Sequence, residues 1–323
     1  MLIETPKRLH LGLIDPSASL GRRFGSLGVA LEGGYRIRIV PHDKLEIRAN
    51  EEDMRTIRFT IDRMNQEFLT GFNYLVEVEN AIPRHIGLGS TTQLTLAVGL
   101  GIATLNGLKI SVERLASLLG RGKNSGAGIY AFKYGGFLVD GGVGKGIPPL
   151  IIREEFPEEW GFLLITPNVR RGLDEEEERP IMERVGGASE IAEKISHRVV
   201  LGLLPALKER DIKEFGKHLT QVQILVGKHF EKYQGGEFRE DIKFIMEFLK
   251  ENTYGYGQSS WGPTVYGLIN REDYTTLKTK TQDFLKAHGI GAQVELGIPR
   301  NKGATTVEEN TYILRLINKV AKS

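Results

Sequence analysis

The chain has 323 residues, 40% of them hydrophobic, and its 43 lysine and arginine residues against 41 aspartate and glutamate residues give a net charge of +2. This length favours two domains over one, and the balanced charge gives no reason to expect nucleic acid as a partner. The absence of cysteine excludes disulfides, thiolate zinc sites and a cysteine nucleophile.

No membrane segment is expected. The apolar runs are all shorter than the ~20 residues that cross a bilayer. Residues 1–15 lack the apolar core and the cleavage site of a signal peptide. We therefore expect a cytoplasmic protein with no membrane partner.

The first 80 residues predict an antiparallel sheet with one helix. Apolar and polar residues alternate over residues 9–13, 35–39 and 74–78, which is the period of a half-buried strand. Apolar side chains at spacings of three and four over residues 51–70 predict an amphipathic helix. Between the first strands lies a glycine-containing loop, and it carries Arg22 and Arg23 side by side.

A glycine-flanked turn then opens into an apolar helix within residues 83–105. We expect the helix to begin at Ser90, with Gln93 completing a capping box. The N–H groups of its first turn and the positive end of its dipole favour an anion, and the two glycines of the turn allow close approach to the main chain. The sequence therefore predicts a phosphate-binding segment formed by Gly87, Leu88, Gly89, Ser90, Thr91 and Thr92.

Residues 121–146 are rich in glycine and follow a short helix that Ser111 caps. A hairpin arm over residues 135–140 explains some of these glycines. The tetrapeptide at residues 125–128, Ser-Gly-Ala-Gly, offers backbone N–H groups without large side chains, as in anion-binding turns. Both a structural and a binding role stay open for it.

The second half of the chain is predicted to be richer in helices. Two strands fall within residues 148–166, and apolar stripes over residues 180–249 predict three helical segments, whose apolar residues, Val226 and Phe230 included, we assign to the core and not to a site. Strands at 264–269 and 293–296 then alternate with helices at 272–288 and 308–319. This irregular order predicts an α+β fold with domains at residues 1–155 and 156–323.

Two further segments carry polar side chains. Residues 253–269 are either a turn or part of a pocket for a planar or phosphorylated ligand, and they contain Gln258, Ser259, Ser260 and Trp261. The acidic run at residues 174–178 favours a helix start, with a magnesium-bearing or substrate-facing loop as the alternative. Arg170 and Arg171 precede it.

Common nucleotide and metal motifs fail. A Walker A motif cannot be built around Gly144 and Lys145, and a dinucleotide fingerprint lacks its third glycine because Thr92 stands there. The seven histidines show no HExxH spacing, so a zinc site is not expected.

The glycine segments together resemble the GHMP kinase superfamily. The sequence PRHIGLGSTTQ resembles its central phosphate loop, Arg8 before Leu-His-Leu resembles its first motif, and residues 255–263 lie where its third motif does. The resemblance implies a two-domain fold with a ribosomal-S5-like N-terminal domain and a ferredoxin-like C-terminal domain with extra helices. Many of these kinases carry a catalytic aspartate where Gly128 stands here.

The more detailed match, over RLHLGLID, LGRRFGSLGVALE and GQSSWGPTVYGLI, resembles the archaeal family of β-ribofuranosylaminobenzene 5′-phosphate synthases. It implies transfer of phosphoribose from phosphoribosyl pyrophosphate to 4-hydroxybenzoate or 4-aminobenzoate in methanopterin biosynthesis, with loss of CO2 and pyrophosphate and with Mg2+ as cofactor. An ATP-dependent kinase and a non-catalytic metabolite-binding regulator are the alternatives.

For this chemistry the sequence supplies two groups of candidates. Catalytic roles are assigned to His10, Asp15, Asp140 and Lys123. His10 and Asp15 or Asp140 would steer protonation or magnesium, and Lys123 would help to hold a carboxylate or phosphate. A buried structural histidine and a hairpin aspartate are equally good explanations of these residues. Substrate binding is assigned to Arg8, Arg22, Arg23, Asn124, Ser125, Gly126, Arg170, Arg171, Gln258, Ser259, Ser260 and Trp261. The metal ligands and the oligomeric state, a homodimer included, stay open.

Overall fold

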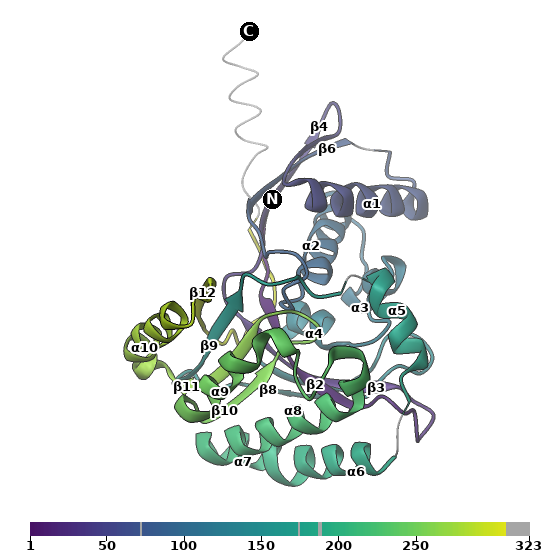
Figure 1. Ribbon diagram of the computed structural model, residues 1–323. Helices are drawn as coiled ribbons and strands as arrows, with labels where there is room; N and C mark the ends of the chain where they lie inside the picture. The colour runs from purple at the N-terminus through teal and green to yellow at the C-terminus, as the bar shows by residue number, and fades with distance from the viewer. Residues whose placement is uncertain (72, 174, 187–188, 308–323) are drawn as a thin grey trace.

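The computed structural model describes residues 1–307 except residues 72, 174 and 187–188. Within these residues the strands form three sheets flanked by helices (Figure 1). The sheet at the N-terminus has the order β13-β1-β4-β6-β5 and consists of β13 (Thr305–Val307), β1 (Leu2–Glu4), β4 (Arg36–His42), β6 (Asn73–Asn80) and β5 (Glu46–Arg48). Only β5 and β6 pair in parallel in this sheet.

The second sheet is antiparallel and has the order β2-β3-β7-β8. Its strands are β2 (Lys7–Asp15), β3 (Phe24–Leu31), β7 (Phe137–Asp140) and β8 (Leu150–Glu154). The register of β2 shifts between His10 and Gly12. Such bulges often lie next to binding sites, because they change the direction in which a side chain points.

An apolar helix forms the centre of the N-terminal half. α2 (Ser90–Leu105) is buried on nearly all sides and packs against α1 (Glu51–Phe68), α3 (Val112–Leu118), α4 (Ala127–Tyr134) and β4. Because this helix is apolar all round, it needs neighbours on every face. Its glycines allow the close approach: a Cβ on Gly101 would lie 2.5 Å from the Cδ1 atom of Ile39.

The third sheet lies in the C-terminal half, with the antiparallel order β10-β11-β9-β12. Its strands are β10 (Gly255–Gln258), β11 (Val265–Asn270), β9 (Trp160–Pro167) and β12 (Ala292–Gly297). The helices α9 (Lys243–Asn252) and α10 (Tyr274–Ala287) pack against it, and the short 3-10 helices Glu240–Ile242 and Arg271–Asp273 precede them.

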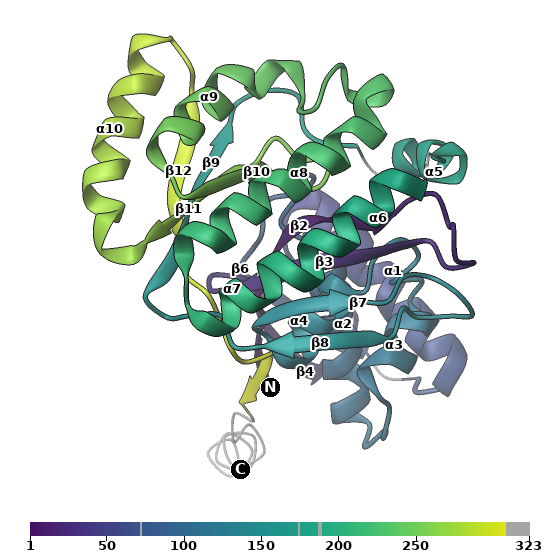
Figure 2. The same cartoon turned by 90° about the horizontal axis from the view of Figure 1, so that it is seen from below.

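The remaining helices cover the second sheet. α6 (Ser189–Arg198) and α8 (Ile212–Gln234) run side by side and both contact β2, as Figure 2 shows from below. A π-helical turn (Val199–Leu203) and α7 (Leu204–Glu209) continue α6, and α5 (Glu175–Arg184) precedes it. None of the described helices is long and apolar enough to cross a membrane.

The predicted fold class is confirmed, with mixed helices and sheets in the expected order. The predicted capping box at Ser90 is wrong, as described below. The division at residue 155 stays a prediction; β13, far from β1 in sequence, nevertheless pairs with it. The helix expected at residues 308–319 lies outside the described residues.

A substitution at Gly216 tests this packing, because the backbone of α8 lies there directly against the backbone at the start of β10. A Cβ on Gly216 would lie 2.2 Å from the carbonyl oxygen of Tyr254. We expect Gly216→Ala to lower the free energy of unfolding by about 1–3 kcal/mol, since a backbone atom cannot move aside like a side-chain end. Urea unfolding measures it. The control Lys217→Ala, at the exposed neighbour, should change it by less than about 0.5 kcal/mol, and equal losses would contradict this packing.

Candidate active site

A cavity of about 750 Å³ lies where the two halves of the chain meet. Its lining comes from β2, the segment between β6 and α2, the start of α2, the glycine-rich segment before α4, α5, α8 and residues 258–262. This size is typical of a small-molecule site. The lining combines polar groups around the start of α2 with a set of apolar side chains.

The start of α2 offers uncompensated backbone donors to this cavity. Gly89 is the N-cap, with φ of 77°, and it forms no side-chain cap. No acidic residue lies in the first turn. The first N–H groups of a helix have no partner within the helix, so those of residues 90–92 remain available to an anion. Gln93 does not close the predicted capping box, because its Nε2 donates to the carbonyl oxygen of Gly128 instead.

Arg8 places a buried positive charge beside this helix start. Its Nη1 donates to the carbonyl oxygen of Gly87 over 3.3 Å, while its Nε is buried without a hydrogen-bond partner among the described residues. A Cβ on Gly89 would lie 3.4 Å from that Nε. Burial lowers the pKa of Arg8 to about 10, partly offset by the nearby Glu178, so the guanidinium stays charged at neutral pH. A desolvated cation beside free helix N–H groups is an arrangement that favours an anion.

His10 lies next to Arg8 and is held in its neutral form. Burial, with a smaller contribution from the charge of Arg8, lowers the pKa of His10 well below its usual value. The bulge of β2 brings the N–H of Gly12 to within 3.3 Å of the His10 Nδ1. Because Nδ1 accepts this hydrogen bond, the ring proton is placed on Nε2. His10 can therefore donate a hydrogen bond from Nε2 without carrying charge.

Residues 258–262, which belong to the C-terminal half of the chain, pack against the turn that precedes α2. The Ser259 hydroxyl donates to the carbonyl oxygen of Gly87 over 2.7 Å and accepts the N–H of His10 over 3.0 Å. A Cβ on Gly262 would lie 2.2 Å from the carbonyl carbon of Ile86. Ser259 is fully buried, so it positions the turn and His10.

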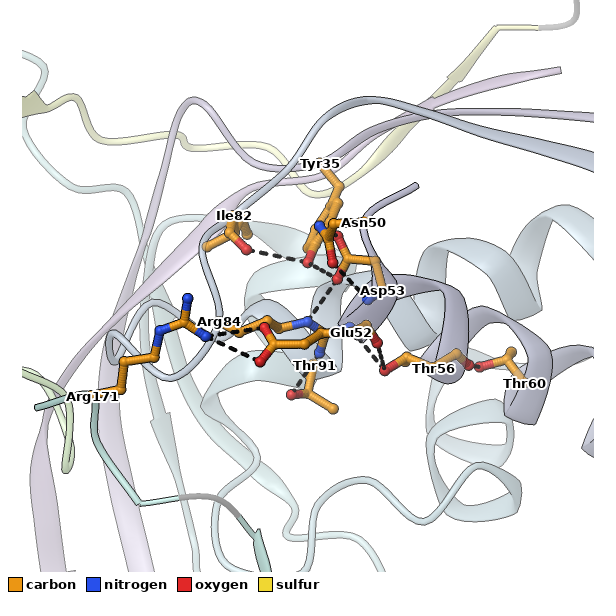
Figure 3. A network of polar contacts seen from close by, with 10 residues as sticks. All are labelled: Tyr35, Asn50, Glu52, Asp53, Thr56, Thr60, Ile82, Arg84, Thr91 and Arg171. Atoms are coloured by element: carbon orange, nitrogen blue, oxygen red, sulfur yellow. Dashed lines mark hydrogen bonds and ion pairs between the residues drawn. The ribbon is translucent and has the colours of Figure 1, made fainter. Parts of the chain in front are cut away.

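A buried ion pair supports the phosphate segment from behind (Figure 3). Arg84 Nε lies 2.6 Å from Asp53 Oδ1, and both side chains are almost fully buried. The guanidinium also donates to the hydroxyls of Thr56 and Thr91, and the hydroxyl of Tyr35 donates to Asp53. Every charged group in this network is paired, which buried ions require. The start of α1 is thereby connected to the first turn of α2.

Many of the predicted substrate contacts meet in the cavity. Besides Arg8, His10 and the phosphate segment except Leu88, the lining includes Arg23, Lys123, Asn124, Ser125, Gln258, Ser260 and Trp261. The amide of Asn124 donates to Glu178 over 3.3 Å. Lys123 is exposed. Leu88 instead lies in the core.

Two of the backbone N–H groups of residues 125–128 are used within the protein. The N–H of Gly126 donates to Asp140, and the N–H of Ala127 donates to the Ser125 hydroxyl, so neither is available to an anion. Asp140 also accepts hydrogen bonds from Ser26 and from the N–H of Gly142, and it lies outside the cavity lining. Burial raises the pKa of Asp140, although these hydrogen bonds oppose the shift. Asp140 organises the hairpin and the start of α4.

The other predicted charged residues lie outside the lining. Asp15 binds Ser17 and Ser19 and closes its own loop. Desolvation raises the pKa of Asp15, but the hydrogen bonds outweigh it and lower the pKa below its usual value. The guanidinium of Arg22 donates to the carbonyl oxygens of Gly141 and Gly142. Arg170 and Arg171 are exposed and pair with Glu177 and Glu52.

Sequence reasoning missed several residues of the lining. Glu178 and Met182 come from α5, and Val226 and Phe230 come from α8. The apolar stripe of α8 was assigned wholly to the core, but its C-terminal end faces the cavity. A spacing of three and four identifies the buried face of a helix and does not distinguish a core from a pocket wall. Gly12 on β2 was the available signal, because a Cβ there would lie 3.2 Å from the Cγ2 of Val226.

Two sequence profiles match the chain. The GHMP kinases N terminal domain matches residues 55–136, which include the phosphate segment. The GHMP kinases C terminal domain matches residues 203–282, which include residues 258–262. The lining residues on β2, β3 and α5 lie outside both matched regions.

Curated relatives match nearly the whole chain. A beta-ribofuranosylphenol 5'-phosphate synthase of Archaeoglobus fulgidus is 30% identical over 93% of this chain and 97% of its own length. A protein of the same name from Methanocaldococcus jannaschii is 29% identical over 94% of this chain and 99% of its own. Among solved structures, the mevalonate kinase of Methanococcus jannaschii has a TM-score of 0.68 at 17% identity, covering 93% of this chain and 98% of that one. The last similarity concerns the fold alone.

The buried ion pair predicts a large loss of stability on mutation of Arg84. Arg84→Met leaves Asp53 buried without its partner, and we expect the free energy of unfolding to fall by about 3–5 kcal/mol. Denaturant unfolding measures it. Arg171→Met is the matched control, because it removes an exposed pair with Glu52 in the same region, and should cost less than about 1 kcal/mol. Similar losses for both variants would show that the Asp53 pair is not the dominant contact.

Because His10 is buried in its neutral form, we expect the stability of the fold to fall at acidic pH. Because the folded pKa lies well below the usual histidine value, the unfolded chain binds the proton first as the pH falls. The stabilisation is therefore present above about pH 6.5 and is lost below it. We expect His10→Asn to lose less unfolding free energy than the unmutated protein between about pH 7 and pH 5. Identical pH profiles in denaturant titrations would contradict a neutral, buried His10.

Proposed function

The chain belongs to the β-ribofuranosylphenol 5′-phosphate synthase family, within the GHMP kinase superfamily, and from this premise we propose that it transfers phosphoribose from phosphoribosyl pyrophosphate to a para-substituted benzoate. The proposed acceptors are 4-hydroxybenzoate and 4-aminobenzoate, and the pathway is tetrahydromethanopterin biosynthesis. The names of the relatives support the ribosyl-phosphate product class.

The observation that carries the proposal is the pairing of the buried Arg8 with the uncapped start of α2. Arg8 has an unused Nε, and the first turn of α2 contains no carboxylate. A leaving pyrophosphate gains negative charge as its bond to ribose breaks. Fixed donors and a desolvated cation stabilise that charge more strongly than water does. The neutral His10 beside them adds no second cation near the ribose.

The proposed reaction needs no covalent enzyme intermediate. The bond from C1 of ribose to the pyrophosphate oxygen breaks, and pyrophosphate leaves with the electron pair. The ring carbon that bears the carboxylate then forms a bond with C1, and the para hydroxyl or amino group delocalises the positive charge of the ring. Cleavage of the bond to the carboxylate releases CO2, and its electron pair restores the aromatic ring. Positioning and electrostatics therefore supply the catalysis.

Magnesium would fit this site as a companion of the pyrophosphate. Within the described residues no group of three or more His, Asp or Glu side chains could hold a metal. In phosphate sites Mg2+ is commonly bound by substrate oxygens and one or two carboxylates. Glu178 and the Ser90 hydroxyl, both in the lining, would hold the ion. Bound there, it would neutralise charge on the pyrophosphate.

An ATP-dependent kinase is the rival that the superfamily suggests. The position of the usual kinase aspartate is Gly128, where a Cβ would lie 3.2 Å from the Cγ2 of Thr92. The start of α4 packs tightly on the start of α2 at this point, so the site has little room for a carboxylate. Loss of the base weakens phosphoryl transfer to a hydroxyl, although positioning alone still supports some.

The decisive assay follows the carboxyl group. Purified protein with carboxyl-labelled 4-hydroxybenzoate or 4-aminobenzoate should release labelled CO2 when phosphoribosyl pyrophosphate and Mg2+ are both present. ATP in place of phosphoribosyl pyrophosphate should give none. Absence of labelled CO2 with both acids would refute the proposed reaction, and ADP formation in a screen of hydroxylated metabolites would support the kinase instead.

A further inference from the structure

One part of the cavity lining has a different chemistry. Leu13, Phe24, Met182, Phe230 and Trp261 form it and belong to one apolar cluster, which we call the aromatic pouch. These residues come from β2, β3, α5, α8 and the segment after β10. Four of them are buried, while Trp261 is half-buried. An apolar wall that continues a phosphate-binding surface has no role in holding an anion.

The shape of the aromatic pouch suits a flat ring. Phe230 and Trp261 meet edge to face, with ring centroids 5.1 Å apart and planes inclined by 80°. Two rings at nearly a right angle offer one face and one edge to a third ring, an arrangement that aromatic groups prefer. The main chain of Trp261 is held in place, because its carbonyl oxygen accepts a hydrogen bond from Arg239 Nη1.

Arg23 supplies a cation at the pouch. Its guanidinium carbon lies 5.5 Å from the centroid of the Phe24 ring, and Nη2 donates to the carbonyl oxygens of Glu183 and Val185. The other guanidinium nitrogens have no partner among the described residues. Glu183 is also among the lining residues, and a carboxylate near Arg23 disfavours a doubly charged phosphate there. A singly charged carboxylate suits this balance of charge.

We propose that the aromatic pouch binds the benzoate acceptor, with its ring against Phe230 and Trp261 and its carboxylate on Arg23. This inference rests on the proposed function and deepens it, because it assigns the two substrates to different parts of one cavity. The anionic donor occupies the start of α2 with Arg8. The nucleobase of a nucleotide is the other flat ligand that an aromatic wall accepts, and it is tested as the rival.

The test measures binding without turnover. Calorimetry follows the titration of 4-hydroxybenzoate into the unmutated protein, with Mg2+ and inorganic pyrophosphate present. Tryptophan fluorescence follows the same titration into the variant Trp160→Phe. That variant leaves Trp261 as the only tryptophan, since the chain has two. We expect saturable heat and saturable quenching, and about tenfold weaker binding in Phe230→Ala. The matched control is Phe244→Ala, whose ring is 63% exposed on α9 and outside the cavity, and it should bind normally.

A second pair of measurements tests Arg23. Arg23→Gln should weaken binding of 4-hydroxybenzoate about tenfold but leave binding of the neutral 4-hydroxybenzamide unchanged, because only the acid needs the cation. Equal losses for both ligands would overturn the assignment of the carboxylate to Arg23.

The outcomes separate this inference from the proposed function. Saturable binding of the acid without release of CO2 would refute the reaction and keep the pouch as an aromatic-acid site. Release of CO2 with unchanged affinity in Phe230→Ala would refute the pouch and keep the reaction. Tighter binding of adenosine than of 4-hydroxybenzoate, with displacement of the acid, would assign the pouch to a nucleobase and overturn the inference.

Discussion

The cavity depends on one backbone contact between the two halves of the chain. Gly87 lies against Ser259 so closely that a Cβ would be 2.1 Å from the Ser259 carbonyl oxygen, and its φ of 91° is unfavourable for other residues. The Ser259 hydroxyl binds Gly87 and His10 at the same point. This contact fixes the start of α2 relative to β2 and to Trp261, so the anion site and the aromatic pouch are held in one cavity.

Two kinds of desolvation give the parts of that cavity their chemistry. At the start of α2 the charge of Arg8 is compensated only in part by Glu178, and we propose that a ligand anion completes the balance. The proposed place for a flat acceptor is the aromatic pouch, where Arg23 offers a single cation. The proposed reaction needs this division, because its donor, from which pyrophosphate leaves, is highly charged, whereas its acceptor, which loses CO2, is mostly apolar.

The sequence predicts the parts of the fold that local rules control. Alternation and helical spacing predict β2, β4, α1 and α2, and the glycines around Leu88 predict the phosphate turn. Contacts between distant residues were not predictable: nothing local pairs Arg84 with Asp53, or directs Gln93 to Gly128 rather than to its own helix end. The apolar part of the cavity lining was missed for the same reason. Phe24, Met182 and Phe230 are ordinary apolar residues until the fold brings them to Trp261.

The central claim is that the start of α2 holds the pyrophosphate of an activated ribose rather than the phosphates of ATP. Calorimetric titration with Mg2+ and without an acceptor compares the two ligands on the unmutated protein. Phosphoribosyl pyrophosphate should bind at least about ten times more tightly than ATP, a difference of about 1.4 kcal/mol. Tighter binding of ATP, with no heat from phosphoribosyl pyrophosphate, would contradict the account.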